Sequence, residues 1–95
     1  MHGSYYVYIL LCHDGSHYVG STQDVAERVA THSAGLGSAF TAKRRPVTLV
    51  YTEKHPDRAS AMRRERQLKR WSHQKRDALI EGDNAKLKQL SKRRS

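Results

Sequence analysis

Residues 5–21, YYVYILLCHDGSHYVGS, decide how the fold begins. The first part of this stretch, residues 5–12, is aromatic, β-branched or aliphatic, which is typical of a buried strand. Residues 13–16, His-Asp-Gly-Ser, have the composition of a hairpin turn, and residues 17–21 indicate a returning strand. Because the connection is so short, the two strands must be antiparallel.

A first helix is predicted directly after this hairpin. Ser21 or Thr22 offers an N-cap, and Asp24 places negative charge in the first helical turn. Residues 35–46, which begin at a glycine and end at a proline, are predicted to be a loop.

The second half of the chain predicts one more strand followed by helices. Residues 47–53, VTLVYTE, alternate as a strand does, and Asp57 is an N-cap for a long helix over residues 58–71. A second helical stretch runs from residue 72 until a glycine at 82 stops it, and the remaining residues can form a short helix. The order β-β-α-β-α-α predicts a small α+β fold, with helices packed on a three-stranded antiparallel sheet.

Charge is the strongest signal in the composition of the 95 residues. Eighteen Lys and Arg against nine Asp and Glu give a net charge of +9, which favours a polyanionic partner. A solvated basic face and an acidic membrane are alternatives, but the basic residues lack the pattern of an interfacial helix. No stretch approaches the roughly 20 apolar residues of a membrane span. Because Cys12 is the only cysteine, no internal disulfide can form, and a cytoplasmic location is expected.

Glu65 stands out on the long helix as its only acidic residue. Its neighbours at three and four residues include Ala61, Met62 and Leu68, so Glu65 lies on the apolar stripe. A carboxylate there is costly unless it is paired or binds a metal. An ion pair with a nearby Arg is the commoner explanation, and a single metal ligand at the edge of the core is the functional one.

Arg28 and His32 lie four residues apart and therefore share one face of the first helix. They are either an ordinary surface pair or a guanidinium directed at a phosphate, with His32 in support. A metal-binding role for His32 is disfavoured because no second His or Cys stands at ligand spacing.

Tyrosines concentrate in the first two strands. Packing is the default role of an aromatic residue in a strand. Alternation places Tyr6, Tyr8 and Leu10 on one face, where a hydroxyl needs a polar partner.

Together these residues resemble the GIY-YIG nuclease superfamily. Tyr6-Val7-Tyr8 stands at the first tripeptide, and Tyr18-Val19-Gly20 at the second. The first helix supplies the Arg-x-x-x-His pattern and the later helix the Glu. The stretches TAKRRP at 41–46 and AMRRERQLKRW at 61–71 are similar to small stand-alone YhbQ-like bacterial proteins. The resemblance implies a GIY-YIG domain over residues 4–81 and a basic tail over residues 82–95.

The resemblance implies a DNA endonuclease with one divalent metal ion, Mg²⁺ or Mn²⁺, held by Glu65. Tyr8 would be the general base, with Tyr18 and His32 positioning groups around it, and Arg28 would stabilise the phosphate. Because an unperturbed tyrosine has a pKa of roughly 10, the site is expected to favour the tyrosinate.

Two departures from the family pattern are visible. Tyr6 stands where the name-giving motif has glycine. Many family nucleases also place an Asn after the metal-binding Glu, whereas Asn84, the only asparagine, lies past the matched region.

Phosphate contacts are expected from six basic residues outside the catalytic set: Lys43, Arg44, Arg45, Arg63, Lys69 and Arg70. DNA of irregular structure, as in repair, is the expected substrate, and RNA is an alternative. A non-catalytic nucleic-acid-binding module is the second hypothesis. An adaptor that holds a protein partner through the loop at 35–46 is the third.

Overall fold

The computed structural model describes the backbone of residues 4–93 and the side chains of residues 4–91. Its sheet has the strand order β2-β1-β3, with both pairings antiparallel. The strands are β1 (Tyr5–Cys12), β2 (His17–Thr22) and β3 (Val47–His55). The predicted fold class, an α+β arrangement of helices on a three-stranded antiparallel sheet, is confirmed.

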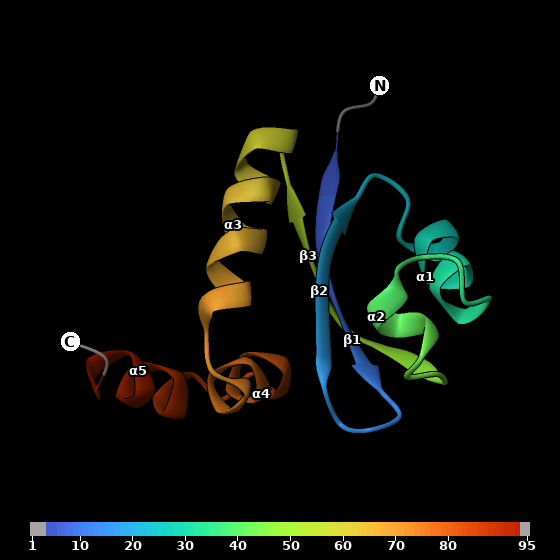
Figure 1. Cartoon of the computed structure of the whole chain (residues 1–95). Coiled ribbons are helices and arrows are strands. Elements are labelled where there is room, and N and C mark those ends of the chain that lie inside the picture. The colour runs from blue at the N-terminus through green and yellow to red at the C-terminus, as the bar shows by residue number, and fades with distance from the viewer. Residues whose placement is uncertain (1–3, 94–95) are drawn as a thin grey trace.

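Helices cover the sheet from two sides (Figure 1). One layer contains α1 (Val25–Ser33) and the short α2 (Ala39–Ala42). The opposite layer contains α3 (Arg58–Arg70), which is followed by α4 (His73–Glu81) and α5 (Asn84–Arg93). No helix within residues 4–93 has the length and apolarity needed to cross a bilayer.

The central strand β1 is buried on both faces, which explains its unbroken apolar sequence. Val7 and Ile9 join a core cluster with residues of α3, including Leu68. Tyr8 and Leu10, at the alternate positions, are fully buried as well, and Tyr8 contacts the α1 layer. The two layers therefore meet different sets of β1 side chains.

Three predicted boundaries were wrong for local reasons. Strand β2 continues through Thr22, so neither Ser21 nor Thr22 caps α1; the Asp24 side chain does so by accepting the Glu27 N–H at 3.0 Å. Strand β3 runs two residues beyond 53, because its pairing with β1 continues to His55.

The expected loop at 35–46 contains one helical turn. Ser38 caps α2 by accepting the Thr41 N–H at 3.1 Å, and the Thr41 side chain is fully buried. The glycines around 35–37 favour a loop, so the sequence did not predict this turn. The turn places the Thr41 hydroxyl inside the α1 layer.

Candidate active site

The candidate catalytic residues gather along the edge strand β2, where the two helical layers approach each other. Neighbouring residues of a strand point to opposite faces. Tyr18 accordingly packs against His32 of α1, with ring centroids 4.8 Å apart. Ser21 instead contacts Glu65 of α3. A site on this edge can therefore draw on side chains from both layers.

Tyr8 places its hydroxyl beneath β2 at Gly20, its partner in the pairing of β1 with β2. A Cβ atom at position 20 would lie 2.5 Å from the Tyr8 hydroxyl oxygen, so glycine is needed there to leave room. The same hydroxyl lies 3.0 Å from His32 Nε2. The glycine of the second tripeptide thus makes space for the tyrosine of the first.

The ionisation of Tyr8 depends mainly on its burial. Burial, with a further contribution from Tyr18, raises the pKa of Tyr8 to about 12. The nearby Arg28 side chain opposes this rise in pKa, whereas the charge of Glu65 adds to it. Burial therefore outweighs the effect of Arg28, and a tyrosinate at Tyr8 with a metal ion bound stays a prediction.

His32 is buried and uses both ring nitrogens. Its Nε2 atom contacts Tyr8, and its Nδ1 atom lies 2.8 Å from the Thr41 hydroxyl oxygen. Burial and the charge of Arg28 lower the pKa of His32 below its ordinary value, so the ring is neutral near pH 7. With both nitrogens engaged, His32 is not available as a metal ligand in this arrangement.

Glu65 has two contacts that bear on metal binding. The Ser21 hydroxyl donates to Oε1 at 2.7 Å, and Lys69 Nζ forms an ion pair with Oε2 at 2.8 Å. The ion pair that the sequence left open is therefore made with Lys69 rather than with an Arg. A carboxylate oriented by a hydroxyl and 21% exposed suits Mg²⁺ or Mn²⁺, which accept one carboxylate and otherwise water or phosphate oxygens. The residues present fit such an ion, provided that it displaces Lys69.

Two hollows lie beside the site. One of about 440 Å³ is lined by residues of β2, α1 and α3, among them Ser21, Arg28 and Arg58. The other, of about 240 Å³, is lined in part by Tyr18 and Lys69. Each hollow includes residues from both layers, so an extended ligand lying along β2 would pass both.

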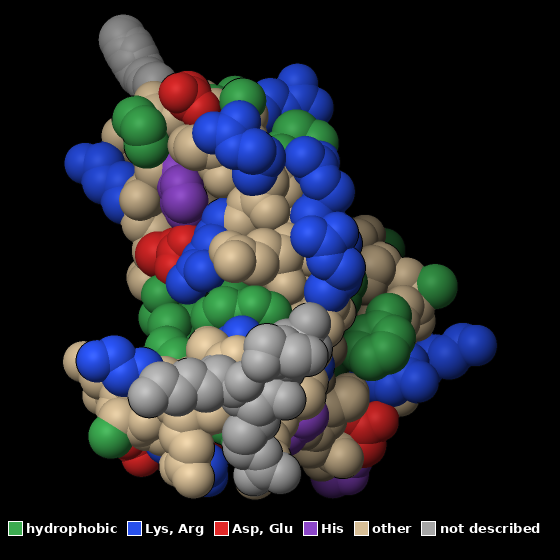
Figure 2. All heavy atoms as spheres, turned by 90° about the vertical axis from the view of Figure 1, so that its left-hand side faces the viewer, with side chains coloured by type: hydrophobic (Ala, Val, Ile, Leu, Met, Phe, Trp, Pro, Cys, Tyr) green, Lys and Arg blue, Asp and Glu red, His purple; other side chains and the backbone are tan. Residues whose placement is uncertain are grey.

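The six residues expected to contact phosphate fall into two groups. Arg63, Lys69 and Arg70 are exposed on α3, and Figure 2 shows Lys and Arg side chains spread over the face that this helix presents. The other three follow α2, where Lys43 and Arg45 are exposed. Arg44 is held by Asp14 at 3.1 Å and stacks on the Phe40 ring at 3.8 Å.

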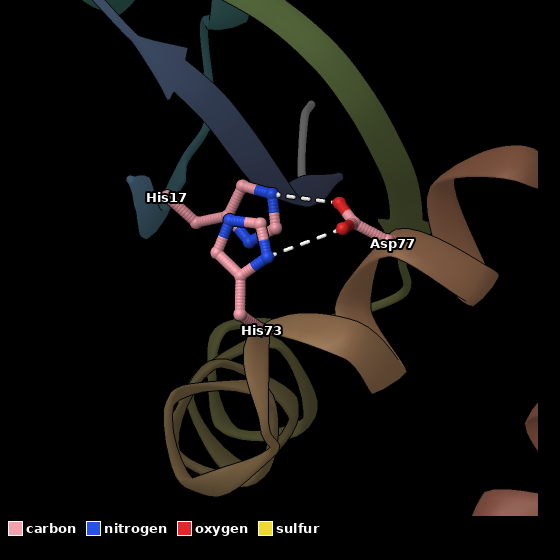
Figure 3. A group of neighbouring side chains, drawn as sticks. All are labelled: His17, His73 and Asp77. Atoms are coloured by element: carbon pink, nitrogen blue, oxygen red, sulfur yellow. Dashed lines mark ion pairs between the residues drawn. The ribbon is translucent and has the colours of Figure 1, made fainter. Parts of the chain in front are cut away.

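A histidine cluster that the sequence did not indicate lies at the far end of β2. Figure 3 shows His17 and His73 side by side, each directed toward one carboxylate oxygen of Asp77, at 3.2 and 3.1 Å. His73 and Asp77 stand four residues apart on α4, but His17 is distant in the chain, so the sequence did not suggest the three as a group of metal-ligand types.

The ring geometry of this cluster does not suit a shared ion. The two imidazoles stack at 3.9 Å with planes 6° apart, so their lone pairs run parallel instead of converging. Arg76 also donates to His17 Nδ1 at 3.0 Å, and His73 bonds the Gly15 carbonyl at 2.8 Å. In this arrangement the cluster joins the β1–β2 turn to α4.

Sequence reasoning missed Ser21, Thr41 and Gly37 as part of the site's surroundings. Thr41 lies within the TAKRRP stretch, but nothing in that pattern indicated a contact with His32. Asn84 is the first residue of α5 and is exposed. No role in the site is assigned to it.

Comparison with known proteins agrees with this geometry. Residues 4–77 match the GIY-YIG catalytic domain. The chain is 48% identical over 77 residues to the UPF0213 protein of Staphylococcus haemolyticus, covering 81% of this chain and 94% of that protein.

Two solution NMR structures are similar. The UPF0213 protein of Bacillus halodurans is 42% identical with a TM-score of 0.54, over 82% of this chain and 83% of that one. A protein of E. faecalis is 35% identical with a TM-score of 0.61, over 88% and 90% of the two chains. With the catalytic-domain match over most of its length, the chain belongs to the GIY-YIG family, among its small UPF0213 proteins.

Proposed function

We propose that the protein is a metal-dependent endonuclease that hydrolyses phosphodiester bonds in DNA, with irregular structures of the kind met in cytoplasmic DNA repair as substrates. The observation that carries this proposal is the surroundings of the Tyr8 hydroxyl. His32 contacts it, and the charges of Arg28 and Glu65 are near enough to change its pKa. A base, a cation and an acidic metal ligand drawn from separate elements are the parts that phosphodiester hydrolysis requires.

The chain's own residues divide the chemistry among them. Tyr8 would remove a proton from the attacking water, for which it must first release its own proton to an acceptor. His32 Nε2, at 3.0 Å, is the acceptor in contact. Arg28 would neutralise charge on the phosphoryl oxygens, and Tyr18 would keep the His32 ring in place by packing on it. A divalent ion held by Glu65 would polarise the phosphate and stabilise the leaving oxygen.

Specificity for a base sequence is expected to be low. The basic residues on α3 and after α2 are suited to phosphates, which carry no sequence information. RNA therefore belongs in the same test as DNA.

The test is cleavage of duplex, single-stranded, flap and four-way DNA and matched RNA, with Mg²⁺ or Mn²⁺, by wild type, Tyr8→Phe and Glu65→Gln. We expect wild type to cut at least one substrate, and chelator or either substitution to abolish cutting while binding persists. Lys54→Ala, which removes an exposed charge from β3, is the matched control and should cut as wild type does. Cutting that survives both substitutions would contradict the assignment of the site.

A non-catalytic nucleic-acid-binding module is the second candidate, and the Glu65–Lys69 ion pair is the observation that favours it. A carboxylate already neutralised by lysine has less need of a metal ion. If this candidate is correct, no substrate is cut, and affinity is unchanged by chelator and by Glu65→Gln.

A further inference from the structure

A line of hydrogen bonds leads from Tyr8 away from β2 into the α1 layer. Tyr8 contacts His32 Nε2 at 3.0 Å, and His32 Nδ1 contacts the Thr41 hydroxyl oxygen at 2.8 Å. The Thr41 hydroxyl then lies 3.4 Å from the Ser38 carbonyl oxygen. Both His32 and Thr41 are buried, so water does not substitute freely for any of these partners.

The far end of this line favours one direction. The Thr41 hydroxyl lies 3.0 Å from Ser38 Oγ, which can donate to it, and a backbone carbonyl can only accept, so the Thr41 proton is directed at the Ser38 carbonyl. The Thr41 oxygen then accepts from His32, which requires the ring proton to be on Nδ1.

The near end fits the same direction. Burial raises the pKa of Tyr8 to about 12, so its hydroxyl keeps its proton, and His32 Nε2 lies 3.0 Å away as an acceptor. That nitrogen must carry a lone pair, which a neutral imidazole has only when Nδ1 holds the proton.

The backbone near Thr41 is shaped to allow this contact. A Cβ atom at Gly37 would lie 2.2 Å from His32 Nδ1, a distance that no side chain could tolerate. The glycine lets the segment before α2 close over the ring, while Ser38 caps the turn that carries Thr41. Both features bring the hydroxyl to the nitrogen.

We propose that Thr41 is a positioning residue that holds His32 as the Nδ1–H tautomer, so that Nε2 can take the proton of Tyr8. This inference rests on the proposed nuclease function, in which Tyr8 is the base. In the step concerned, the Tyr8 O–H bond breaks and an Nε2–H bond forms on His32. The products are a tyrosinate beside Arg28 and an imidazolium whose Nδ1–H still donates to Thr41. Tyr8 then takes a proton from the attacking water, and His32 gives its Nε2 proton to solvent, which balances the proton that the leaving oxygen takes up.

The tautomer can be measured without any cleavage assay. Long-range ¹H–¹⁵N correlation spectra of protein with ¹⁵N-labelled histidine distinguish a protonated Nδ1 from a protonated Nε2, and His32→Asn identifies the signal. We expect Nδ1–H in wild type and in Thr41→Ser, and a population of Nε2–H in Thr41→Val. Thr48→Val, the same substitution at an exposed threonine of β3, is the matched control and should leave the tautomer unchanged.

Wild type with Nε2–H, or Thr41→Val with the wild-type tautomer, would overturn the proposal. The wild-type spectrum can overturn the proposal whether or not Thr41→Val folds, and Thr41→Ser tests the role of the hydroxyl with a smaller change. Denaturation midpoints of the variants separate a local change from unfolding.

Cleavage supplies the second readout once a substrate is known. Thr41→Val should lower kcat at least about tenfold with KM unchanged, because a general-base pathway is impaired while phosphate binding is not. Thr41→Ser should restore the rate. A Thr41→Val enzyme with wild-type kcat would overturn the proposal, whereas absence of cutting by wild type would count against the nuclease function and leave the tautomer result standing.

Discussion

Gly20 and Tyr8 form one unit of the site, because the absence of a side chain at Gly20 leaves the space that the Tyr8 hydroxyl occupies. The φ angle of Gly20 is not in the left-handed region, so conformational freedom is not the reason for glycine there. The reason is the 2.5 Å approach that a Cβ would make to a fully buried hydroxyl.

Gly20→Ala should therefore displace the Tyr8 ring. Overpacking of this kind costs about 1–3 kcal/mol of unfolding free energy, measured by urea denaturation. Cleavage should also fall, because the hydroxyl leaves His32.

Gly82→Ala is a suitable control for this substitution. Gly82 ends α4 in the left-handed region with φ 72°, and a Cβ there meets no atom within 4 Å. Alanine should cost about 1–2 kcal/mol through the backbone alone and leave cleavage unchanged. Equal effects of both variants on cleavage would contradict the steric explanation for Gly20.

At this scale, sequence indicated the residue types but not their contacts. The order and spacing of the family motifs made five residues candidates, and the structure brings them together along β2: Tyr8, Tyr18, Arg28, His32 and Glu65. The hydrogen-bond partners of Glu65 and His32 could not be predicted from the sequence. Ser21 and Thr41 are unremarkable in the sequence, and only the close packing of separate elements turns their hydroxyls into partners.

Between elements, Glu53 joins β3 to α3 and supplies a titratable contact. Its carboxylate accepts hydrogen bonds from Tyr51 at 2.6 Å and from Arg64 at 2.9 Å, and it contacts His55 at 2.7 Å. Burial opposes ionisation, but these partners outweigh it and hold the pKa of Glu53 below its ordinary value.

A lowered folded-state pKa makes this contact contribute stability above the unfolded-state pKa, about 4.3 for Glu. The contribution should be lost as pH falls from there through the folded-state pKa. Glu53→Gln should therefore lower the free energy of unfolding at pH 7 and weaken its decline below pH 4.5, as followed by denaturation at a series of pH values. If the free energy of unfolding of Glu53→Gln falls below pH 4.5 as steeply as that of wild type, Glu53 does not control this decline.

Sequence patterns located the long elements well and the short ones poorly. Strand β1 and helix α3 have enough residues for their periodicity to be visible. The single turn of α2 has no period to detect, and its cap at Ser38 follows a glycine pair that favours a loop. The start of α1 was misplaced because strand pairing extended β2 over the candidate caps.

For the molecule as a whole, charge should govern affinity for nucleic acid. Arg63 and Arg70 make no ion pair or hydrogen bond within the described residues and are exposed on α3. If each contacts one phosphate, replacing both by Ala should reduce the slope of log K against log salt concentration by roughly 2. Lys54→Ala, on β3, should leave the slope unchanged. An equal reduction of the slope in this control would indicate that affinity depends on the overall charge of the protein and not on contacts made by α3.

The domain boundary can be tested by removing α5. That helix packs mainly against α4, with Leu87 and Leu90 half-buried, and the removed segment 84–95 carries five Lys and Arg. Ending the chain at residue 83 keeps the glycine cap of α4 and should cost at most about 3 kcal/mol of stability. We expect cleavage to persist with weaker binding, as measured by denaturation and salt titration. Unfolding on truncation would place the domain end beyond residue 81.

The site draws on both layers of the molecule, and this has a consequence for damaged copies of the protein. The basic surface of α3 needs only that helix, whereas chemistry at Tyr8 needs α1 and α3 closed on the same strand. A copy in which the α1 layer has loosened would still occupy DNA and would be unable to cut it. If the proposed nuclease function is correct, partial loss of structure would leave a protein that binds DNA without cutting it and shields the strand from intact copies.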